Sequence, residues 1–433
     1  MISKRLFLTL LLAALLLGLG AGFLLASRAR SRHARPPATH GGPAPTDPRP
    51  DGWTVADKPP TVQEIQEELN ALGYSQAVEE STGSKGVTLH DPAQSQPGWN
   101  LVLPAHEPLA VILDMDGNVL HEWRFPYRDV PGARNSQLGN WRRVRALDDG
   151  GLLGIFEGFG LIRIDRDSRL VWYQPGNFHH ELDVADDGRI YALARHFALW
   201  PRFHPEAPTV EDFVVELAPD GRELGRFSLI AAFENSAHAP RLYDTKRGGD
   251  IFHTNALRLF DGSLERLSPL FGKGKALISI RHLDAIAILD LESEKIVWTQ
   301  SGLWHLQHDP TLLENGHLLV FDNQTTPERS SVVEVDPFTQ EVVWAFRGSS
   351  ENDFFSRVCG TCQRLPNGNT LITESTRGRA LEVTPAGEIV WRYESAYHVG
   401  ENPADVAVLF DVVRLPGEHP LDWLEPAVRE PGR

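Results

Sequence analysis

Three histidines occupy matched places in a repeating sequence pattern. His180 and His308 each lie eight residues before a turn glycine, and His253 lies nine residues before another. Histidine acts as a nucleophile, acid or base near neutral pH, and three neutral imidazoles can also bind zinc. If the repeats close into a ring, equivalent positions converge, so we expect these side chains to share one site. A repeat can also keep a histidine for packing alone, and that interpretation stays open.

Two further polar residues suit an anion. Asn255 follows His253 by two positions, which places both side chains on one face of a strand. Arg281 begins another strand of the same repeat, in which alternation puts His282 on the opposite face. A guanidinium offers a fork of donors to sulfate or phosphate, lowers the pKa of a nearby histidine, and disfavours a metal dication. We therefore predict a nucleophilic, anion-binding site with no metal and no cofactor.

Six strand–turn–strand segments must position these residues. Each has apolar alternation, an Asp or Gly pair at the turn and a second strand that ends in an aromatic residue. They begin at Ala110, Leu161, Val214, Ile286, Val332 and Ala380. Trp298, Trp344 and Trp391 lie 46 and 47 residues apart. Four short strands in each period of about 45–50 residues are typical of a β-propeller, whereas a β-sandwich with a second domain fits this period poorly. We predict an all-β, six-bladed propeller over residues 98–416, closed by a strand at residues 407–415 that completes the first blade.

The N-terminal residues predict a membrane anchor. Residues 1–27 contain the apolar run Leu6–Ala26, which at about 1.5 Å per residue spans a bilayer core of about 30 Å. A cleaved signal peptide is the alternative, but the run is longer than a usual signal core and no clear cleavage site follows it. We expect one N-terminal transmembrane helix and a membrane-anchored protein.

Three segments complete the expected organisation. Residues 28–60 are rich in Pro and Arg without periodicity and predict a disordered tether. Residues 61–97 are expected to hold a short amphipathic helix, which begins at Thr61 with capping-box spacing, and a connecting segment. Residues 417–433 form a C-terminal tail.

The side of the membrane is argued from two opposing features. Arginines such as Arg28 and Arg30 follow the apolar run, and the positive-inside tendency would leave the propeller in the cytoplasm. Cys359 and Cys362, in the stretch CGTC, are either a small loop disulfide or two inert thiols. A disulfide requires an oxidising compartment. Whether these cysteines form a disulfide stays open, and we favour a propeller on the periplasmic, extracytoplasmic side.

The charge balance excludes one class of partner. The chain of 433 residues carries 42 Lys and Arg against 58 Asp and Glu, a formal net charge of −16. Such an acidic protein has no electrostatic footprint for nucleic acid. The expected partners are small molecules and the membrane, and the oligomeric state stays open.

At the residues of the predicted site the chain resembles the bacterial arylsulfotransferase family, whose members take a sulfuryl group from a sulfate ester and need no nucleotide sulfate donor. The similar stretches are FHTNALRLFDG, ISIRHLDAIAILD, QHDPTLLENGHLLVFDNQ and, less closely, HHELDVADDG. The resemblance covers the propeller from about residue 98 to the last blade. It implies a six-bladed ring and an enzyme that moves a sulfuryl group from an aryl sulfate to a phenolic acceptor.

The resemblance also implies residue roles. His308 matches the histidine that the family sulfurylates in a ping-pong reaction. His253 and Asn255 match its His-x-Asn pair, and Arg281 matches its sulfate-holding arginine. His180 matches the remaining histidine. In that scheme Arg281, Asn255 and His253 stabilise the developing charge, and either His180 or His253 protonates the leaving phenolate.

Two other residues are assigned to substrate binding, His179 and Asn323. His179 is the less favoured match for the family's remaining histidine. Asn323 lies in Asp322-Asn323-Gln324, where better-known family members have Asp-Asn-Gly. Those members are mostly soluble periplasmic enzymes, with a disulfide shortly before the catalytic histidine, so this chain departs from them in its anchor and in the place of its cysteines.

Two alternative functions remain at this point. The ring could be a non-catalytic binding or assembly propeller in which the histidines have lost their role. It could also be a metal-dependent propeller lyase or hydrolase that uses His180, His253 and His308 as ligands.

Overall fold

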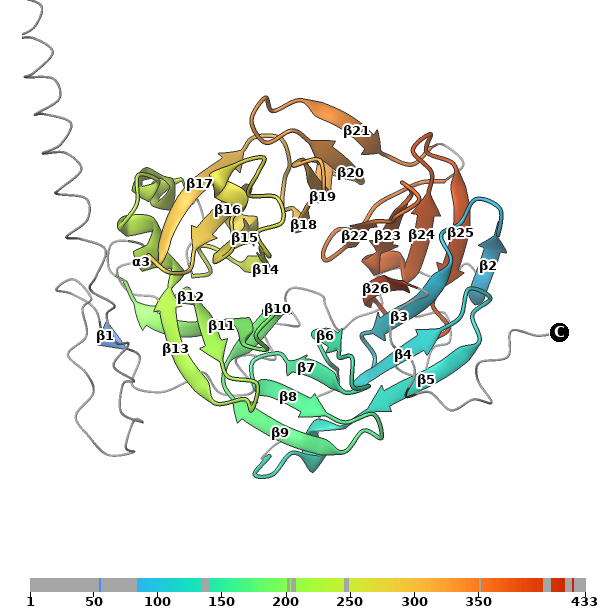
Figure 1. Cartoon of the computed structure of the whole chain (residues 1–433), viewed down its shortest axis with the longest axis horizontal. Helices are drawn as coiled ribbons and strands as arrows, with labels where there is room; N and C mark the ends of the chain where they lie inside the picture. Colours follow the sequence, from blue (N-terminus) through green and yellow to red (C-terminus); the bar gives the residue numbers. More distant parts are fainter. Residues whose placement is uncertain are drawn as a thin grey trace, which may run out of the picture. The chain divides into compact units, whose positions relative to one another are not determined.

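The fold is an all-β ring of six sheets (Figure 1), as the sequence predicts. The computed structural model describes residues 54–55, 84–133, 140–200, 203, 208–244, 249–349, 352–399, 406–416 and 423. Each sheet forms one blade, and consecutive strands of a blade are antiparallel. The innermost strands surround the centre of the ring, where the predicted site lies.

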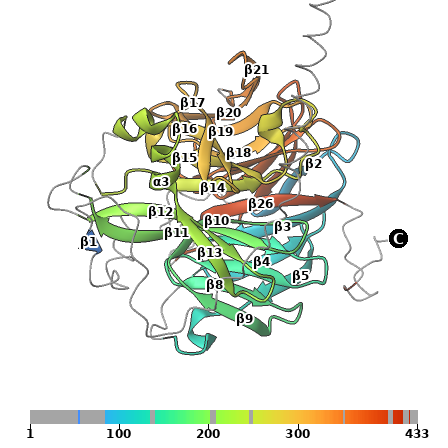
Figure 2. The same cartoon turned by 60° about the vertical axis from the view of Figure 1, so that its left-hand side comes forward.

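The first three blades run from the innermost strand outward. Blade 1 consists of β26 (Leu409–Pro416), β3 (Gly98–Pro104), β4 (Leu109–Leu113) and β5 (Val119–Arg124); blade 2 of β6 (Arg143–Ala146), β7 (Leu152–Phe156), β8 (Gly160–Ile164) and β9 (Leu170–Pro175); blade 3 of β10 (Phe178–Val184), β11 (Ile190–Leu199), β12 (Pro208–Leu217) and β13 (Glu223–Ser228). The short strand β1 (Thr54–Val55) pairs with β11. Figure 2 brings blade 3 forward, with the helix α3 (Leu229–Glu234) beside it.

The other three blades follow the same order. Blade 4 consists of β14 (Thr254–Leu259), β15 (Lys275–Ile280), β16 (Ala285–Asp290) and β17 (Lys295–Ser301); blade 5 of β18 (His308–Leu312), β19 (Leu318–Thr326), β20 (Arg329–Val335) and β21 (Val342–Phe346); blade 6 of β22 (Thr361–Arg364), β23 (Thr370–Glu374), β24 (Arg379–Val383) and β25 (Ile389–Glu394). Short 3₁₀ helices lie at Tyr127–Asp129, Ala239–Tyr243, Pro269–Phe271, Arg281–Leu283 and Ser375–Arg377. The strand β2 (Gly86–His90) adds a fifth, outer strand to blade 6.

The hairpin turns explain the regular Asp and Gly signals of the sequence. In the β4–β5 turn the Asp114 carboxylate accepts hydrogen bonds from the backbone N–H groups of Asp116 (2.9 Å) and Asn118 (2.8 Å). Gly117 has a φ of 88°, a conformation in which a Cβ would be strained. The carboxylate therefore accepts from backbone N–H groups that have no strand partner at the turn, and glycine adopts the positive φ that reverses the chain direction.

The repeated tryptophans connect neighbouring blades. The indole N–H of Trp123 donates to the carbonyl of Gly150 in the next blade (3.0 Å), and Trp344 donates likewise to Pro385 (2.9 Å). Trp391, in the last blade, donates to the carbonyl of Met115 in the first (2.9 Å). Because each of these indoles reaches a turn of the following blade, the spacing of the tryptophans follows the spacing of the blades.

Apolar side chains fill the spaces between adjacent blades. Trp123 and Trp141 lie fully buried between blades 1 and 2, and Phe233 and Phe252 lie between blades 3 and 4. Burying one such large side chain contributes about 1.5–3 kcal/mol. The ring is therefore held by the contacts between its sheets, and the centre is left for polar residues.

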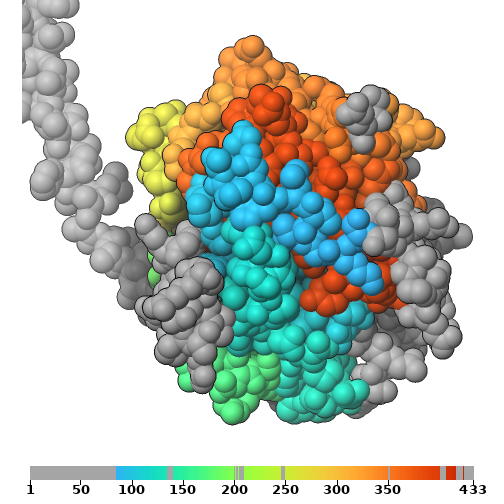
Figure 3. Space-filling view, turned by 90° about the vertical axis from the view of Figure 1, so that its right-hand side faces the viewer, coloured from blue at the N-terminus to red at the C-terminus, as the bar shows by residue number. Residues whose placement is uncertain are grey.

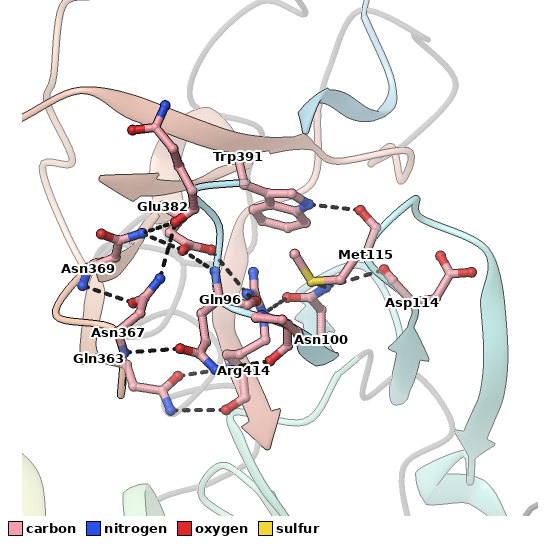
Figure 4. Close-up of polar contacts among 12 residues, drawn as sticks. Gln96, Asn100, Asp114, Met115, Gln363, Asn367, Asn369, Glu382, Trp391 and Arg414 are labelled. Carbon is pink, nitrogen blue, oxygen red and sulfur yellow. Dashed lines mark hydrogen bonds and ion pairs between the residues drawn. The ribbon is translucent and has the colours of Figure 1, made fainter. Parts of the chain in front are cut away.

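The C-terminal strand closes the ring, as predicted, because β26 pairs with β3 as the innermost strand of blade 1. From β26 the Arg414 guanidinium donates to Asn100 of the same blade (2.7 Å) and pairs with Glu382 of blade 6 (3.0 Å), while Gln363 of β22 bonds the Arg414 backbone (Figure 4). Figure 3 shows this seam from outside, with the blue segment that contains β2 between the orange-red last blade and the cyan first blade. The last strand of the chain is thus joined to both sides of the seam.

A ring of polar side chains crosses the centre of the propeller, with one contribution from each innermost strand. Its members, here called the channel ring, are Arg143, Glu181, Arg258, Asp309, Thr361 and Asp411. Arg143 pairs with Glu181 (2.9 Å) and Asp411. Arg258 pairs with Asp309 (2.6 Å) and Glu181 (3.5 Å). The Thr361 hydroxyl bonds Asp411 (2.7 Å), and the next backbone N–H, of Cys362, donates to Asp309 (2.9 Å), which completes the circle.

The elements expected before residue 84 lie almost wholly outside the described residues. This applies to the transmembrane helix in residues 1–27, the tether in residues 28–60 and the amphipathic helix that begins at Thr61. Among the residues that the structure describes, none of the helices is both long enough and apolar enough to cross a membrane.

Candidate active site

Irregular starts of the innermost strands bring the predicted histidines together. His180 and His253 have positive φ values of 51° and 49°, and the strand pairing shifts register at both places. A third shift follows His308, where Asp309 has a φ of 48°. Bulges of this kind turn side chains away from regular alternation and are common next to active sites. The backbone strain is therefore concentrated where the candidate residues lie.

His308 lies buried at the start of β18 with one ring nitrogen held in place. Its Nδ1 lies 2.7 Å from Asn323 Oδ1 and 3.0 Å from the Leu306 carbonyl. The Asn323 amide group donates to the carbonyls of Ser356 (2.9 Å) and Cys359 (2.6 Å), which orients its oxygen toward His308. Both neighbours of Nδ1 are acceptors, so Nδ1 carries the hydrogen and Nε2 carries the lone pair.

The environment of His308 keeps its imidazole neutral. Burial holds the pKa of His308 well below its usual value, and the positive charges of Arg281 and Arg142 lower it further. Its Nε2 has no hydrogen-bond partner among the residues that the structure describes. A neutral, oriented imidazole with an available lone pair is the form that attacks an electrophile.

His253 lies next to His180 and close to an aspartate. The ring centroids of His180 and His253 are 4.8 Å apart, and His253 Nδ1 lies 2.5 Å from a carboxylate oxygen of Asp250. Both imidazoles are buried. The structure thus brings the two histidines together, as the matched repeat positions predict.

Arg281 also lies at this site, but the prediction for its neighbour His282 is wrong. Residues Arg281–Leu283 form a 3₁₀ helix between β15 and β16 and not the start of a strand, so alternation does not apply to them. His282 turns toward the site: its ring centroid is 4.8 Å from that of His253, and its Nε2 is 2.9 Å from Arg281 Nη1. Arg281 is buried, and its Nε has no hydrogen-bond partner in the described part of the chain. A buried, unused guanidinium donor suits a bound anion.

Asn255 lies against the backbone that precedes the candidate nucleophile. Its amide group donates to the carbonyl of Gln307 (2.9 Å), which is the residue before His308. Contrary to the prediction, strand alternation does not place Asn255 on the face of His253, because His253 precedes β14 and has a left-handed backbone conformation. The amide nitrogen of Asn255 therefore supports the position of His308.

His179 and His180 both lie in the interior, although they are consecutive residues. Their Nδ1 atoms are 2.9 Å apart, and His179 Nε2 lies 3.5 Å from Asp212. Glu157 lies 3.8 Å from His180 and 3.6 Å from Arg195. Burial holds the pKa of each imidazole well below its usual value, with nearby arginines acting in the same direction. The two histidines are therefore neutral groups within a positively charged surrounding.

Arg142 belongs to this site and was missed. Its guanidinium lies over the ring of Phe410 (4.8 Å) and pairs with Glu157 (3.5 Å), and its charge lowers the pKa of both His180 and His308. A sequence signal for it exists: Arg142 lies eight residues before Gly150, the spacing that singled out the two histidines. Applying the same count to every repeat would have found it.

The described residues fit a metal ion poorly. Their one group of metal-ligand type comprises Asp250, His253 and His282, which differs from the set of His180, His253 and His308 weighed above. A dication there would lie beside Arg281, whose Nη1 is 2.9 Å from His282 Nε2. Positive charge so close disfavours a metal and favours an anion.

Of the two possibilities for Cys359 and Cys362, the structure has the pair of thiols and not the disulfide, because both residues are buried and free. Cys359 packs in the apolar cluster between blades 1 and 2, and Cys362 packs in the cluster between blades 5 and 6. The side chains thus point into different parts of the core. Burial raises the pKa of both thiols, so both are inert protonated groups.

A cavity of about 590 Å³ lies at the far ends of β10 and β14, away from the histidines. Among its lining residues are Asp183, Arg258 and Lys273, and none of the histidines described above. Arg258 belongs to the channel ring, while His180 and His308 directly precede other ring members in sequence. The channel ring therefore separates this cavity from the candidate site.

The buried histidines predict a loss of stability in weak acid. His180 is neutral when folded, because burial lowers its pKa, whereas an unfolded histidine titrates near pH 6.5. Below that pH the unfolded chain binds a proton that the folded chain excludes, so this contribution to stability is complete above about pH 6.5 and lost below it. Relative to a His180→Gln variant, the wild type should lose about 1.4 kcal/mol per pH unit between about pH 6.5 and 5. Urea unfolding of both proteins across that range measures the difference, and parallel stability curves would contradict the prediction.

Comparisons with known proteins add little on the ring itself. No curated protein matches the chain. Among solved structures, a protein of unknown function from Bacteroides caccae is 13% identical, with a TM-score of 0.48, and covers 73% of this chain and 98% of its own. A structure of streptogramin B lyase is 10% identical, with a TM-score of 0.39 over 77% of this chain and 88% of its own. At these values the likeness carries no argument beyond the propeller that the strands already define.

A family comparison is decisive. The model of the arylsulfotransferase family (ASST) matches residues 144–396. This range is more than half of the 433 residues, and it contains every predicted site residue from His179 to Asn323. The family implies sulfuryl transfer, with aryl sulfates and phenols as substrates in general. The chain belongs to the arylsulfotransferase family.

Proposed function

We propose that the protein moves a sulfuryl group from an aryl sulfate to a phenolic acceptor through a covalent sulfohistidine on His308. The single observation that carries this proposal is the state of the His308 imidazole: it is buried and neutral, its Nδ1–H is held by Asn323, and its Nε2 has no partner in the described chain. A histidine kept for packing alone would bond that second nitrogen to a neighbour.

The first half-reaction places the donor sulfate at Arg281. Its unused Nε–H and the neighbouring charge of Arg142 offer donors and positive potential to the sulfonate oxygens. His308 Nε2 attacks the sulfur in line with the bond to the aryl oxygen. The N–S bond forms as the S–O bond breaks, and the phenolate takes a proton from a nearby imidazole.

The second half-reaction reverses these steps with another phenol. The imidazole that gave up the proton removes one from the acceptor hydroxyl, and the phenolate oxygen takes the sulfuryl group from His308. Asn323 serves both halves, because an amide oxygen on Nδ1–H stabilises the positive charge that the ring gains when Nε2 is sulfurylated.

The test is an intact-mass measurement on the wild type. The protein, mixed with 4-nitrophenyl sulfate in the absence of acceptor, should gain one sulfuryl group as one equivalent of nitrophenol is released. Added phenol should remove the adduct, and peptide mapping should place it on His308. Nitrophenol release without an adduct would favour direct transfer, and neither adduct nor release across a panel of aryl sulfates would favour a binding propeller.

We also propose that the protein is anchored in a membrane with the propeller on the extracytoplasmic side. The apolar run Leu6–Ala26 supports the anchor. A disulfide does not support the extracytoplasmic side, since Cys359 and Cys362 are free thiols. Fractionation of cells that express the full chain, compared with a chain that begins at Gly52, tests the anchor, and protease protection of the propeller tests the side. Recovery of both chains in the soluble fraction would contradict the proposal.

A further inference from the structure

Asp250 is a partly buried connection between two groups of the candidate active site. One of its carboxylate oxygens accepts the backbone N–H of His253 (2.8 Å), and the other lies 2.5 Å from His253 Nδ1. Its backbone carbonyl lies 2.7 Å from His282 Nδ1. One residue thus bonds both imidazoles that lie next to each other at the site.

These bonds determine how the two rings present their other nitrogens. An ionised carboxylate and a carbonyl can only accept, so each imidazole donates through Nδ1–H. His253 therefore turns Nε2 away from Asp250. The Nε2 of His282 accepts from Arg281 Nη1 (2.9 Å) and so orients the guanidinium that would hold the sulfate. Asp250 therefore fixes the orientation of His253, an acid–base candidate. Through His282 it also fixes the orientation of Arg281, an anion-binding group.

The charge of Asp250 supports this role. Burial acts to raise the pKa of Asp250, but the charge and hydrogen bond of His253 outweigh burial and hold the pKa well below its usual range. The neighbouring carboxyl, Asp212, behaves oppositely, because burial and the charge of Asp250 raise its pKa to about 7. Asp250 is thus the carboxylate that stays ionised beside an imidazole.

His180, the other acid–base candidate, has different neighbours. Its Nδ1 faces the Nδ1 of His179 (2.9 Å), and the Glu157 carboxylate, 3.8 Å away, also pairs with Arg142 and Arg195. Burial and the charge of Arg142 hold the pKa of His180 well below its usual value. His180 is therefore suited to remain neutral, whereas His253 has a carboxylate oxygen 2.5 Å from its Nδ1 that fixes the direction of its ring.

We propose that Asp250 is a positioning residue that makes His253, and not His180, the group that protonates the leaving phenolate and later deprotonates the acceptor phenol. The inference rests on the sulfuryl transfer proposed above. In the first half-reaction His308 Nε2 bonds to sulfur, the bridging S–O bond breaks, and its electron pair takes the proton of the His253 imidazolium. In the second half-reaction the neutral His253 takes the acceptor proton, so protons and charge balance over the cycle.

The test compares donors whose leaving groups need a proton to different extents. Nitrophenolate is a weak base and leaves without protonation, whereas phenolate leaves well only as phenol. An Asp250→Asn variant cannot accept both bonds from His253, because an amide has one acceptor oxygen. Adduct formation in a single turnover should fall about 100-fold with phenyl sulfate and less than about fivefold with 4-nitrophenyl sulfate.

Two controls separate this role from a structural one. Asp212→Asn changes a neighbouring buried carboxyl that accepts from the backbone N–H of Thr254 (2.8 Å), so any loss should be equal for the two donors. His253→Gln should reproduce the donor dependence of Asp250→Asn, and the double variant should be no worse than His253→Gln alone. An equal loss for both donors in Asp250→Asn would overturn the inference, as would the donor dependence appearing in His180→Gln. Absence of an adduct in the wild type would overturn the proposed function itself.

Discussion

Replacement of His308 by alanine is expected to abolish the sulfuryl adduct and to lower the transfer rate by about 10⁴-fold or more. Residues that form a covalent intermediate carry effects of this size, because their loss removes the whole two-step route. Rates of nitrophenol release and intact mass would be measured on the same samples. His308→Gln keeps a polar side chain opposite Asn323, so equal inactivity of both variants would separate lost chemistry from lost packing.

The matched control is His305→Ala, three residues earlier in the same segment. The His305 side chain is 61% exposed and lies 3.4 Å from Asp284 on the outside of the site. That variant should keep both the adduct and the rate. An adduct that persists in His308→Ala, or that maps to His180, would assign the nucleophile elsewhere.

The second large effect concerns stability. Arg143→Met removes the cation between Glu181 and Asp411 at the channel ring. Breaking a buried charge pair from one side typically costs about 3–5 kcal/mol, because the remaining charge is left uncompensated in a poorly solvated place. Urea unfolding of the variant should show a loss of that size.

Two comparison variants make this prediction specific to the channel ring. Arg169→Met removes an arginine whose side chain is 73% exposed and which pairs with Asp167 at a hairpin turn, so no measurable change is expected. A triple variant, Arg143→Met with Glu181→Gln and Asp411→Asn, removes the stranded charges and should recover part of the loss. A single variant as stable as Arg169→Met would show that the ring adds nothing to the fold.

The ring of blades could be predicted from local patterns, because the apolar alternation and the turn residues of each hairpin can be recognised in the sequence. The position of a histidine relative to a turn glycine also survives folding, since the count runs along one hairpin. This count locates His180 and His308, and Arg142 obeys it as well. The spacing therefore marks the position on the strand, whereas the residue type at that position differs between blades.

The rest of the site depends on conformations that have no local signal. His180 and His253 adopt positive φ values that side chains other than glycine seldom take, and only the surrounding structure makes them tolerable. The 3₁₀ helix at Arg281–Leu283 likewise replaces an expected strand and turns His282 inward. The bonds from Asp250 to His253 and His282 follow from these irregular segments, so counting along the sequence could not place them.

The closure of the ring has a consequence for the order in which the protein can mature. Blade 1 has its three outer strands near residue 100, but its innermost strand, β26, comes at residues 409–416. A growing chain therefore keeps blade 1 unfinished until almost its whole length has been made. Phe410, which lies under Arg142, and Asp411, which pairs with Arg143, arrive with that strand. An incomplete chain would lack part of the wall of the candidate site, so the proposed sulfuryl transfer is expected only after the last strand has joined the ring.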